Sequence, residues 1–248
     1  MKNYDQAKIN DMREAGKICS KIFSELGKAI SPGVKIIEID NLAEKLSRDM
    51  NVLPAFKGYE GFPASICASL NDIVVHGIPD TTVLSKGDIL GVDFGIKYRG
   101  VYSDMSFTFP VGKITLREKK LISATKDAVL AGVSKAVPGN KVGDIGAAMQ
   151  KVVEKAGYSV VREMVGHGIG HHLHEDPYVP GYGRPGRGET LYRGQTLAIE
   201  AIVNEGSPEI CISAEDGWTT YTEDGMLSAL FEHTIVVDET PEILTNWD

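Results

Sequence analysis

The sequence predicts an α/β protein in which a helix–helix–hairpin unit occurs twice. Apolar residues recur at helical spacing over residues 12–30, and a second helical pattern runs over 38–50. Two apolar segments joined by a short polar turn, at 89–109, predict a β-hairpin. Near residue 117 the same order of patterns begins again, which is typical of an internal duplication.

Three pairs of matching segments carry the repeat. They are 31–50 with 137–156 at an offset of 106 residues, 84–93 with 191–200 at an offset of 107, and 103–109 with 231–237 at an offset of 128. The larger third offset predicts an insertion of about 21 residues in the second half. We expect one domain over residues 1–248, with two facing repeats at about 5–112 and 113–245. Chance recurrence of Pro-Gly turns before helices is the alternative explanation.

The matches place four acidic residues at equivalent strand positions. Asp93 corresponds to Glu200, and Asp104 corresponds to Glu232. With the hairpin turn at residues 98–99, Asp93 and Asp104 are direct cross-strand partners on one face of the sheet. Two ionised carboxylates this close, in an apolar strand, repel each other and are costly to desolvate, so something must compensate.

Three compensations are open: a proton shared between carboxylates, an arginine, or a metal cluster. The nearby arginine is Arg99, which lies in the turn, and one proton cannot neutralise four carboxylates. Two divalent cations would balance them, as in two-metal hydrolases. For any one of these acids taken alone, a solvated residue on an edge strand is the simpler explanation.

Glycine-flanked histidines offer nitrogen ligands for such a cluster. Residues 164–177, MVGHGIGHHLHEDP, hold four of the six histidines, and their glycines allow close backbone approach. One imidazole with four carboxylates is a hard ligand set that favours Mn²⁺, Fe²⁺ or Co²⁺ over a structural zinc. The three cysteines are widely spaced and odd in number, which indicates free thiols and argues against a cysteine-based zinc site.

Composition and charge exclude several classes of protein. A chain of 248 residues with 42% hydrophobic content can bury a substantial core. No apolar run approaches the roughly 18 residues of a membrane helix, and no signal peptide is evident, so we expect a cytoplasmic protein without membrane contact. A net charge of −8 without a Lys/Arg cluster disfavours DNA binding, while docking on a nucleoprotein through a small local patch stays open.

Taken together, the motifs closely resemble the bacterial type I methionine aminopeptidases of peptidase family M24. The resemblance covers nearly the whole chain and lies in the segments HGIP, GVDFG, YSDMSFTF, GHGIGHHLHEDP, LAIEAIV and LFEHTIVV. It implies the pita-bread fold, an α/β architecture of two pseudo-symmetric halves around a central metal site. Type II relatives insert a helical subdomain between the last two glutamates, and the 32-residue step from Glu200 to Glu232 leaves no room for one. The large N-terminal domain of prolidases is not expected here.

The resemblance also implies roles for individual residues. The ligands of two divalent ions would be Asp93, Asp104, His167, Glu200 and Glu232, with Asp104 and Glu232 bridging both ions. Glu200 would also carry protons, and His76 and His174 would contact the substrate beside the cluster. An apolar pocket for a methionine side chain would be lined by Phe56, Tyr59, Phe62, Cys67, Leu173 and Trp218.

Two features depart from the family pattern. Leu173 stands where relatives often carry an aromatic residue, which predicts a wider pocket lip. His171 and His172 replace the arginine-containing pair expected from the family. We expect these two to be surface histidines without a role, with an extra metal or a pH response as the alternatives.

The activity implied by the resemblance is removal of the N-terminal methionine from nascent proteins and peptides, with a small second residue favoured. Hydroxide bound by two ions of Co, Mn or Fe(II) would attack the scissile carbonyl. We expect a monomer, and association with the ribosome stays open. Two rival classes are a non-catalytic homologue that binds a protein or ribosomal partner, and a dinuclear phosphoesterase. Release of methionine from a tripeptide, compared with turnover of a phosphodiester, separates all three.

Overall fold

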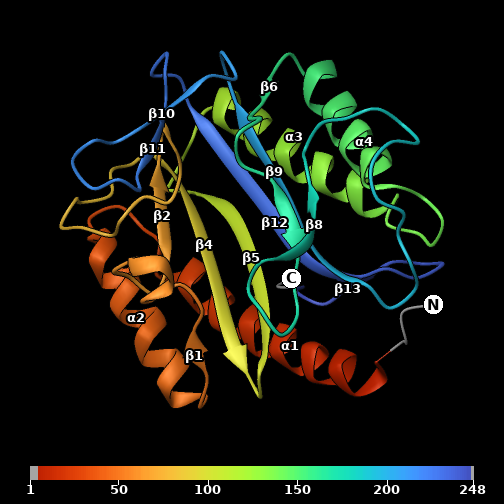
Figure 1. Cartoon of the computed structure of the whole chain (residues 1–248). Helices are drawn as coiled ribbons and strands as arrows, with labels where there is room; N and C mark the ends of the chain where they lie inside the picture. The colour runs from red at the N-terminus through yellow and green to blue at the C-terminus, as the bar shows by residue number, and fades with distance from the viewer. Residues whose placement is uncertain (1–4, 247–248) are drawn as a thin grey trace.

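The computed structural model describes residues 5–246 of the chain (Figure 1). The helices in this part are α1 (Gln6–Ala29), α2 (Ile36–Asp49), the one-turn η1 (Tyr59–Gly61), α3 (Leu116–Val133) and α4 (Val142–Lys155). The strands are β1 (Leu53–Pro54), β2 (Cys67–Leu70), β3 (Ile73–Val75), β4 (Ile89–Tyr98), β5 (Val101–Pro110), β6 (Ser159–Val160), β7 (Gly166–Gly168), β8 (Glu175–Val179), β9 (Thr196–Asn204), β10 (Ile210–Ile212), β11 (Thr220–Thr222), β12 (Ser228–Val236) and β13 (Glu242–Ile243). Within the described residues, no helix combines the length and the apolar character needed to cross a bilayer.

The strands of this part of the chain form two antiparallel sheets. The larger sheet has the order β1-β4-β5-β12-β9-β7-β8, with β2 paired to β4, β13 paired to β12 and β6 paired to β9. The smaller sheet has the order β10-β11-β3. The long strands β4, β5, β12 and β9 are neighbours, so the centre of the larger sheet takes two strands from each half of the chain.

Each half has two helices followed by short strands and two long strands, which confirms the predicted α/β class with pseudo-symmetric halves. The helix α1 packs on β4 and β5 and against α2, and α3 packs on β9 and β12 and against α4 (Figure 1). The two halves also share a loop contact. The Gly33 amide donates to the Leu84 carbonyl at 2.8 Å, and at the equivalent position of the second half the Gly139 amide donates to the Leu191 carbonyl at 2.9 Å. The limits of the repeats, 5–112 and 113–245, stay a prediction.

The connections between the central strands differ in length between the halves. Residues 99–100 join β4 to β5, whereas residues 205–227 join β9 to β12, a connection that is 21 residues longer. The predicted insertion is therefore this connection. It carries β10 and β11, and β11 pairs with β3 of the first half.

Both predicted helices of the first half are present as α1 and α2, although α1 begins earlier, at Gln6. At the start of α2 the Glu38 carboxylate accepts a hydrogen bond from the Lys35 amide at 3.0 Å. At the start of α4 the Asp144 carboxylate accepts one from the Lys141 amide at 2.7 Å. Each of these hydrogen bonds satisfies a backbone amide at the start of its helix. In both halves the acidic residue follows the lysine by three positions, and this spacing favours a helix start at that point.

The hairpin of β4 and β5 has a different register from the predicted one. Residues 99–100 form the turn, and both have positive φ, of 47° and 84°, as in the type I′ turns of two-residue hairpins. Asp93 therefore lies opposite Ser106, and Asp104 lies opposite Gly95. The predicted direct pairing of Asp93 with Asp104 is wrong. The two side chains still share one face, as diagonal neighbours.

Apolar side chains fill the space between the sheet and the helices of each half. One cluster lies among α1, α2, β4 and β5 and includes the buried Phe94, and the other lies among α3, α4, β9 and β12 and includes the buried Phe231. All three cysteines are free thiols. The central strands of each half are thus packed against that half's helices, which holds the acids they carry in place.

Candidate metal centre

One row of paired residues crosses four adjacent strands of the larger sheet. Asp93 on β4 pairs with Ser106 on β5, which in turn pairs with Glu232 on β12. Glu232 pairs directly with Glu200 on β9. Directly paired residues point to the same face of a sheet, so the three carboxylates project on one side.

Asp104 joins this face from the neighbouring position of β5. It lies two residues from Ser106, so its side chain points to the same side, and it is opposite Gly95 of β4. A Cβ atom at Gly95 would come within 3.1 Å of the Asp104 Oδ1 and 3.0 Å of the Ala55 Cβ, so the glycine makes room for the carboxylate. The Thr234 hydroxyl donates to the Asp104 carbonyl at 2.8 Å and accepts from its amide at 2.9 Å.

His167 brings an imidazole to the acids from β7, where it lies opposite Ala198 of β9. Its Nδ1 is 2.9 Å from the Gly168 carbonyl oxygen, which can only accept. In the neutral ring Nδ1 therefore carries the proton, and Nε2 offers its lone pair. Ligand atoms of Asp104, His167 and Glu232 lie within 4.8 Å of one another, which is close enough to hold a metal ion.

Burial shifts the pKa of every one of these groups. Desolvation raises the pKa of Asp104 to about 7 and that of Glu200 to about 7. The pKa values of Asp93 and Glu232 are raised well above their ordinary range, first by desolvation and next by the charge of Asp104. Burial lowers the pKa of His167 to about 4, so its ring is neutral at pH 7 and available as a ligand.

The chemistry of this donor set fits a cation. Asp93 Oδ1 and Asp104 Oδ1 are buried and have no hydrogen-bond partner among the described residues. Asp104 and Glu232 are each only 3% exposed. Buried polar atoms are normally paired, and a buried carboxylate needs a compensating charge. Oxygen ligands with one neutral imidazole are the set that Mn²⁺, Fe²⁺ and related divalent ions take.

A cavity of about 530 Å³ opens over the acids. Every residue that the sequence assigns to the site lines it: Phe56, Tyr59, Phe62, Cys67, His76, Asp93, Asp104, His167, Leu173, His174, Glu200, Trp218 and Glu232. Within the described lining no lysine or arginine is present to neutralise the carboxylates. The fold thus brings all the candidates together, and the role of each one stays a prediction.

Aromatic side chains shape the cavity beside the acids. The Phe62 and Trp218 rings meet edge to face with centroids 5.2 Å apart, and Trp218 also meets the His76 ring at 6.1 Å. His76 directly follows β3 and has a φ of 57°, a left-handed conformation that is uncommon for a non-glycine residue and recurs at functional sites. Burial lowers the pKa of the His76 imidazole.

His174 lies in the segment between β7 and β8. Its ring meets that of His167 edge to face, with centroids 4.4 Å apart, and its Nδ1 is 2.8 Å from the Tyr59 hydroxyl oxygen. Desolvation lowers the pKa of the His174 imidazole. The neighbouring Leu173 is 2% exposed, so this part of the cavity wall is aliphatic.

Seven further residues line the cavity, and no sequence pattern singles them out. They are Glu60, Val75, Glu163, Met164, Val165, Tyr178 and Ile202. Most of them lie in loops or at strand ends, where no periodicity marks a position. Glu60 carries one signal, because it stands in a turn flanked by glycines. His171 and His172 are exposed and do not line the cavity, and the His171 Nδ1 is 3.3 Å from the Gly100 carbonyl oxygen.

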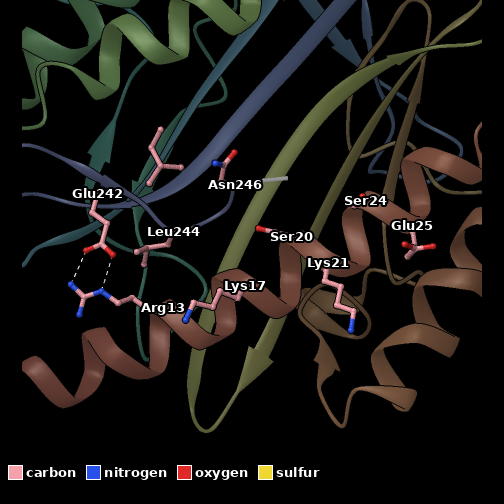
Figure 2. A pocket seen from close by; sticks show the side chains of 10 residues that line it. Arg13, Lys17, Ser20, Lys21, Ser24, Glu25, Glu242, Leu244 and Asn246 are labelled. Carbon is pink, nitrogen blue, oxygen red and sulfur yellow. Dashed lines mark hydrogen bonds and ion pairs between the residues drawn. The ribbon is translucent and has the colours of Figure 1, made fainter. Parts of the chain in front are cut away.

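A second cavity, of about 630 Å³, lies between α1 and the C-terminal segment that includes β13. Figure 2 shows Arg13 extended toward Glu242, to which its guanidinium donates two hydrogen bonds of 2.8 and 2.7 Å. Lys17 on the same wall is paired with Glu14 at 2.7 Å. None of the residues assigned from the sequence lines this cavity, so the acidic cavity is the candidate site.

Comparison with known proteins identifies the family of this chain. The chain matches the model of metallopeptidase family M24 over residues 10–239. It is 48% identical to the methionine aminopeptidase of Clostridium acetobutylicum, over 97% of both chains, and 46% identical to methionine aminopeptidase 1 of Bacillus subtilis, over 94% of both chains. The crystal structure of methionine aminopeptidase from Rickettsia prowazekii, 39% identical, has a TM-score of 0.97 and covers 99% of this chain and 100% of that one.

The fold and the buried donor set define a hydrolase that uses divalent metal ions. The chain belongs to metallopeptidase family M24, within its bacterial type I methionine aminopeptidases. The resemblance read from the sequence is therefore confirmed, as is the pita-bread fold that it implies.

Proposed function

We propose that this chain is a metal-dependent exopeptidase that removes the N-terminal methionine from nascent proteins and peptides and favours a small second residue. The observation that carries the proposal is the convergence of four carboxylates and one neutral imidazole on a cavity walled by aromatic side chains. The names of the relatives that are 46–48% identical over nearly the full chain support the same activity.

The residues that would hold the metal are Asp93, Asp104, His167, Glu200 and Glu232. The orphaned oxygen atoms of Asp93 and Asp104 and the neutral imidazole of His167 suit hard divalent ions, and four carboxylates balance two ions better than one. Asp104 lies diagonal to Asp93, and Glu232 lies in the row between Ser106 and Glu200. These central positions support our proposal that Asp104 and Glu232 would be the carboxylates shared by both ions. Bound Co, Mn or Fe(II) would supply Lewis acidity at the scissile carbonyl and a site for the free amine.

Protein side chains would perform the proton transfer and charge stabilisation. The Glu200 carboxylate would take a proton from the attacking water and return it to the leaving amine. His76 and His174 would donate hydrogen bonds to the substrate carbonyl oxygen as negative charge develops there. The lowered pKa values of both imidazoles keep them neutral at pH 7, when each ring has one N–H to donate.

The apolar part of the cavity would bind the methionine side chain. Its wall is formed by Phe56, Tyr59, Phe62, Cys67, Leu173 and Trp218. A thioether packs favourably against aromatic edges, so this lining suits methionine better than a charged or branched polar side chain. Crowding beyond the first residue would favour a small second residue, because only a small side chain fits beside the occupied wall.

The proposal extends to the setting of the reaction. Nascent polypeptides in the cytoplasm would be the substrates, and the chain would act as a monomer, with access to new N-termini at the ribosome. The net charge of −8 argues against DNA as a partner.

The activity test compares chelator-stripped protein with protein reloaded with Co²⁺ or Mn²⁺. Loaded protein is expected to release free methionine from Met-Ala-Ser, and stripped protein is expected to be inactive. A phosphodiester and a peptide with a blocked amine serve as controls and should stay intact. Full activity after stripping would contradict the metal requirement. Loaded protein that leaves every peptide intact would favour the non-catalytic rival, and phosphodiester turnover would favour the phosphoesterase.

A further inference from the structure

We propose that Tyr59 is a positioning residue that holds His174 in the tautomer with its proton on Nε2. The hydroxyl of Tyr59 then keeps that N–H available to a ligand in the cavity. The consequence for turnover rests on the proposed function, whereas the tautomer itself is a property of the protein.

The contact joins two distant parts of the chain. The Tyr59 hydroxyl oxygen lies 2.8 Å from the His174 Nδ1, and the two residues are 115 positions apart. Their rings meet edge to face, with centroids 5.2 Å apart and an interplanar angle of 74°. Both residues line the same cavity as the acids, so the bond lies within the wall of the site.

The direction of this hydrogen bond follows from the two partners. A phenol O–H is a stronger acid than an imidazole N–H, and an imidazole nitrogen is a stronger base than a phenol oxygen. The Tyr59 hydroxyl therefore donates, and the His174 Nδ1 accepts. A neutral imidazole has one N–H, so its proton lies on Nε2.

Two histidines in contact are thus held in opposite tautomers. The His167 Nδ1 carries a proton because its partner, at 2.9 Å, is the Gly168 carbonyl, which cannot donate. The His174 Nδ1 lacks one because its partner donates. The rings are 4.4 Å apart between centroids. One histidine therefore presents a lone pair, as a metal ligand must, and its neighbour presents an N–H, as a donor to a substrate oxygen must.

The backbone holds Tyr59 in place for this contact. It stands in a turn, residues 58–61, in which the other three residues have positive φ of 84°, 48° and 91°. The Tyr59 amide donates to the Phe56 carbonyl at 2.9 Å, and the Gly58 amide donates to the Phe62 carbonyl at 2.8 Å. A turn closed in this way fixes the point from which the side chain leaves, so little entropy is lost in directing the hydroxyl.

The substitution Tyr59→Phe keeps the ring in the cavity wall and removes only the hydroxyl. We expect kcat for Met-Ala-Ser to fall about threefold to tenfold, the usual effect of one lost hydrogen bond, with KM and metal content nearly unchanged. Tyr98→Phe is the matched control, because Tyr98 ends β4 outside the acidic cavity and its ring contact with Arg99 does not need the hydroxyl. It should leave kcat unchanged.

The spectroscopic test does not depend on activity. Protein labelled with ¹⁵N at histidine, studied both stripped of metal and loaded with diamagnetic zinc, reports the protonated nitrogen of each ring. The His174 signals are assigned from their loss in His174→Gln. We expect a protonated Nε2 and an unprotonated Nδ1 at His174, and a movement toward averaged tautomers in Tyr59→Phe but not in Tyr98→Phe.

Several outcomes would overturn the inference. A proton on the His174 Nδ1 in the wild-type protein would do so, and this result is available even if Tyr59→Phe fails to fold. A rise in KM in Tyr59→Phe, with unchanged kcat and unchanged ¹⁵N shifts, would show that Tyr59 only lines the pocket and does not position His174. Wild-type protein that releases no methionine would refute the proposed function alone, because the ¹⁵N spectra would still decide the tautomer.

Discussion

Glu200 on β9 and Glu232 on β12 are direct register partners, so two carboxylates face each other at the centre of the larger sheet. Partners of this kind have Cβ atoms roughly 4.5–5.5 Å apart, where like charges destabilise the strand pair. A proton or a cation must lie among them. The strand pairing at the middle of the fold and the proposed chemistry therefore depend on the same charge balance.

Removing one central carboxylate is expected to remove metal. Glu232→Gln and Asp104→Asn each keep the shape of the side chain and lose the charge, so metal content per chain should fall and methionine release should drop at least 100-fold. Elemental analysis after gel filtration measures the content. Glu25→Gln, on the wall of the second cavity, is the control and should bind as much metal as the wild type. Unchanged content in both central variants would refute the ligand assignment.

Metal-free protein should lose stability as the pH rises. The folded-state pKa of Glu200 is about 7, against 4.5 in the unfolded chain, so between these values the folded state keeps a proton that the unfolded state releases. The stabilising contribution of this group is fully present below pH 4.5 and is lost as the pH rises through about 7. The raised pKa of Asp104 acts in the same direction, while the lowered pKa of His167 opposes it below pH 6.5.

Divalent metal should reverse that trend, because it binds the ionised carboxylates. The measurement is Tm with and without Mn²⁺ from pH 5 to pH 8, and the difference isolates the site from other titrating groups. We expect the Mn²⁺ increment to be larger at pH 8 than at pH 5. An increment that is equal at both pH values would show that the buried carboxylates are not the groups that bind the ion.

Gly95→Ala should damage the site without touching any proposed ligand. The added Cβ would stand 3.1 Å from the Asp104 Oδ1, which is tighter than ordinary packing, so the carboxylate must move. Metal affinity is expected to fall about tenfold to 100-fold. Gly183→Ala controls for tight packing alone. Its added Cβ would stand 3.3 Å from the Gly143 Cα, at a position outside the acidic cavity. Equal metal affinity in both variants would contradict the role of Gly95.

The two cavity histidines outside the donor set should affect rate and leave metal in place. His76→Ala and His174→Ala remove hydrogen-bond donors to developing charge, so kcat is expected to fall roughly 100-fold. Stopped assays of methionine release, with metal content measured on the same samples, test this. His171→Ala is the control, because His171 is exposed and lies outside the cavity. Loss of metal from His174→Ala would mean that His174 is itself a ligand.

The sequence predicted the four acids and their common face, but it missed how they pair. The prediction placed the hairpin turn at residues 98–99, whereas Gly100 is the residue best able to adopt the second left-handed position, which moves the turn to 99–100. That shift changes the direct partner of Asp93 from Asp104 to Ser106. The prediction of a common face is still correct, because Ser106 and Asp104 are two residues apart on the same strand and such residues point to the same side of a sheet.

Parts of the cavity could not be predicted from periodicity. Glu163 and Tyr178 come from the segments around β7 and β8, where short strands and loops carry no repeating pattern. The contact of Tyr59 with His174 joins residues of different halves, and its geometry depends on a turn of three positive φ values. Residue types identify which side chains suit metal chemistry, but the orientation of an imidazole depends on its hydrogen-bond partner in the folded chain.

The long connection between β9 and β12 has one more consequence. A perfect duplication would give a cavity with the same surroundings on both sides of its pseudo-axis, and a peptide could then enter in either sense. The connection breaks that equivalence, because it places Trp218 against His76 and pairs β11 with β3. The structure thereby gives the cavity a polarity, so an amino end and a carboxyl end meet different walls.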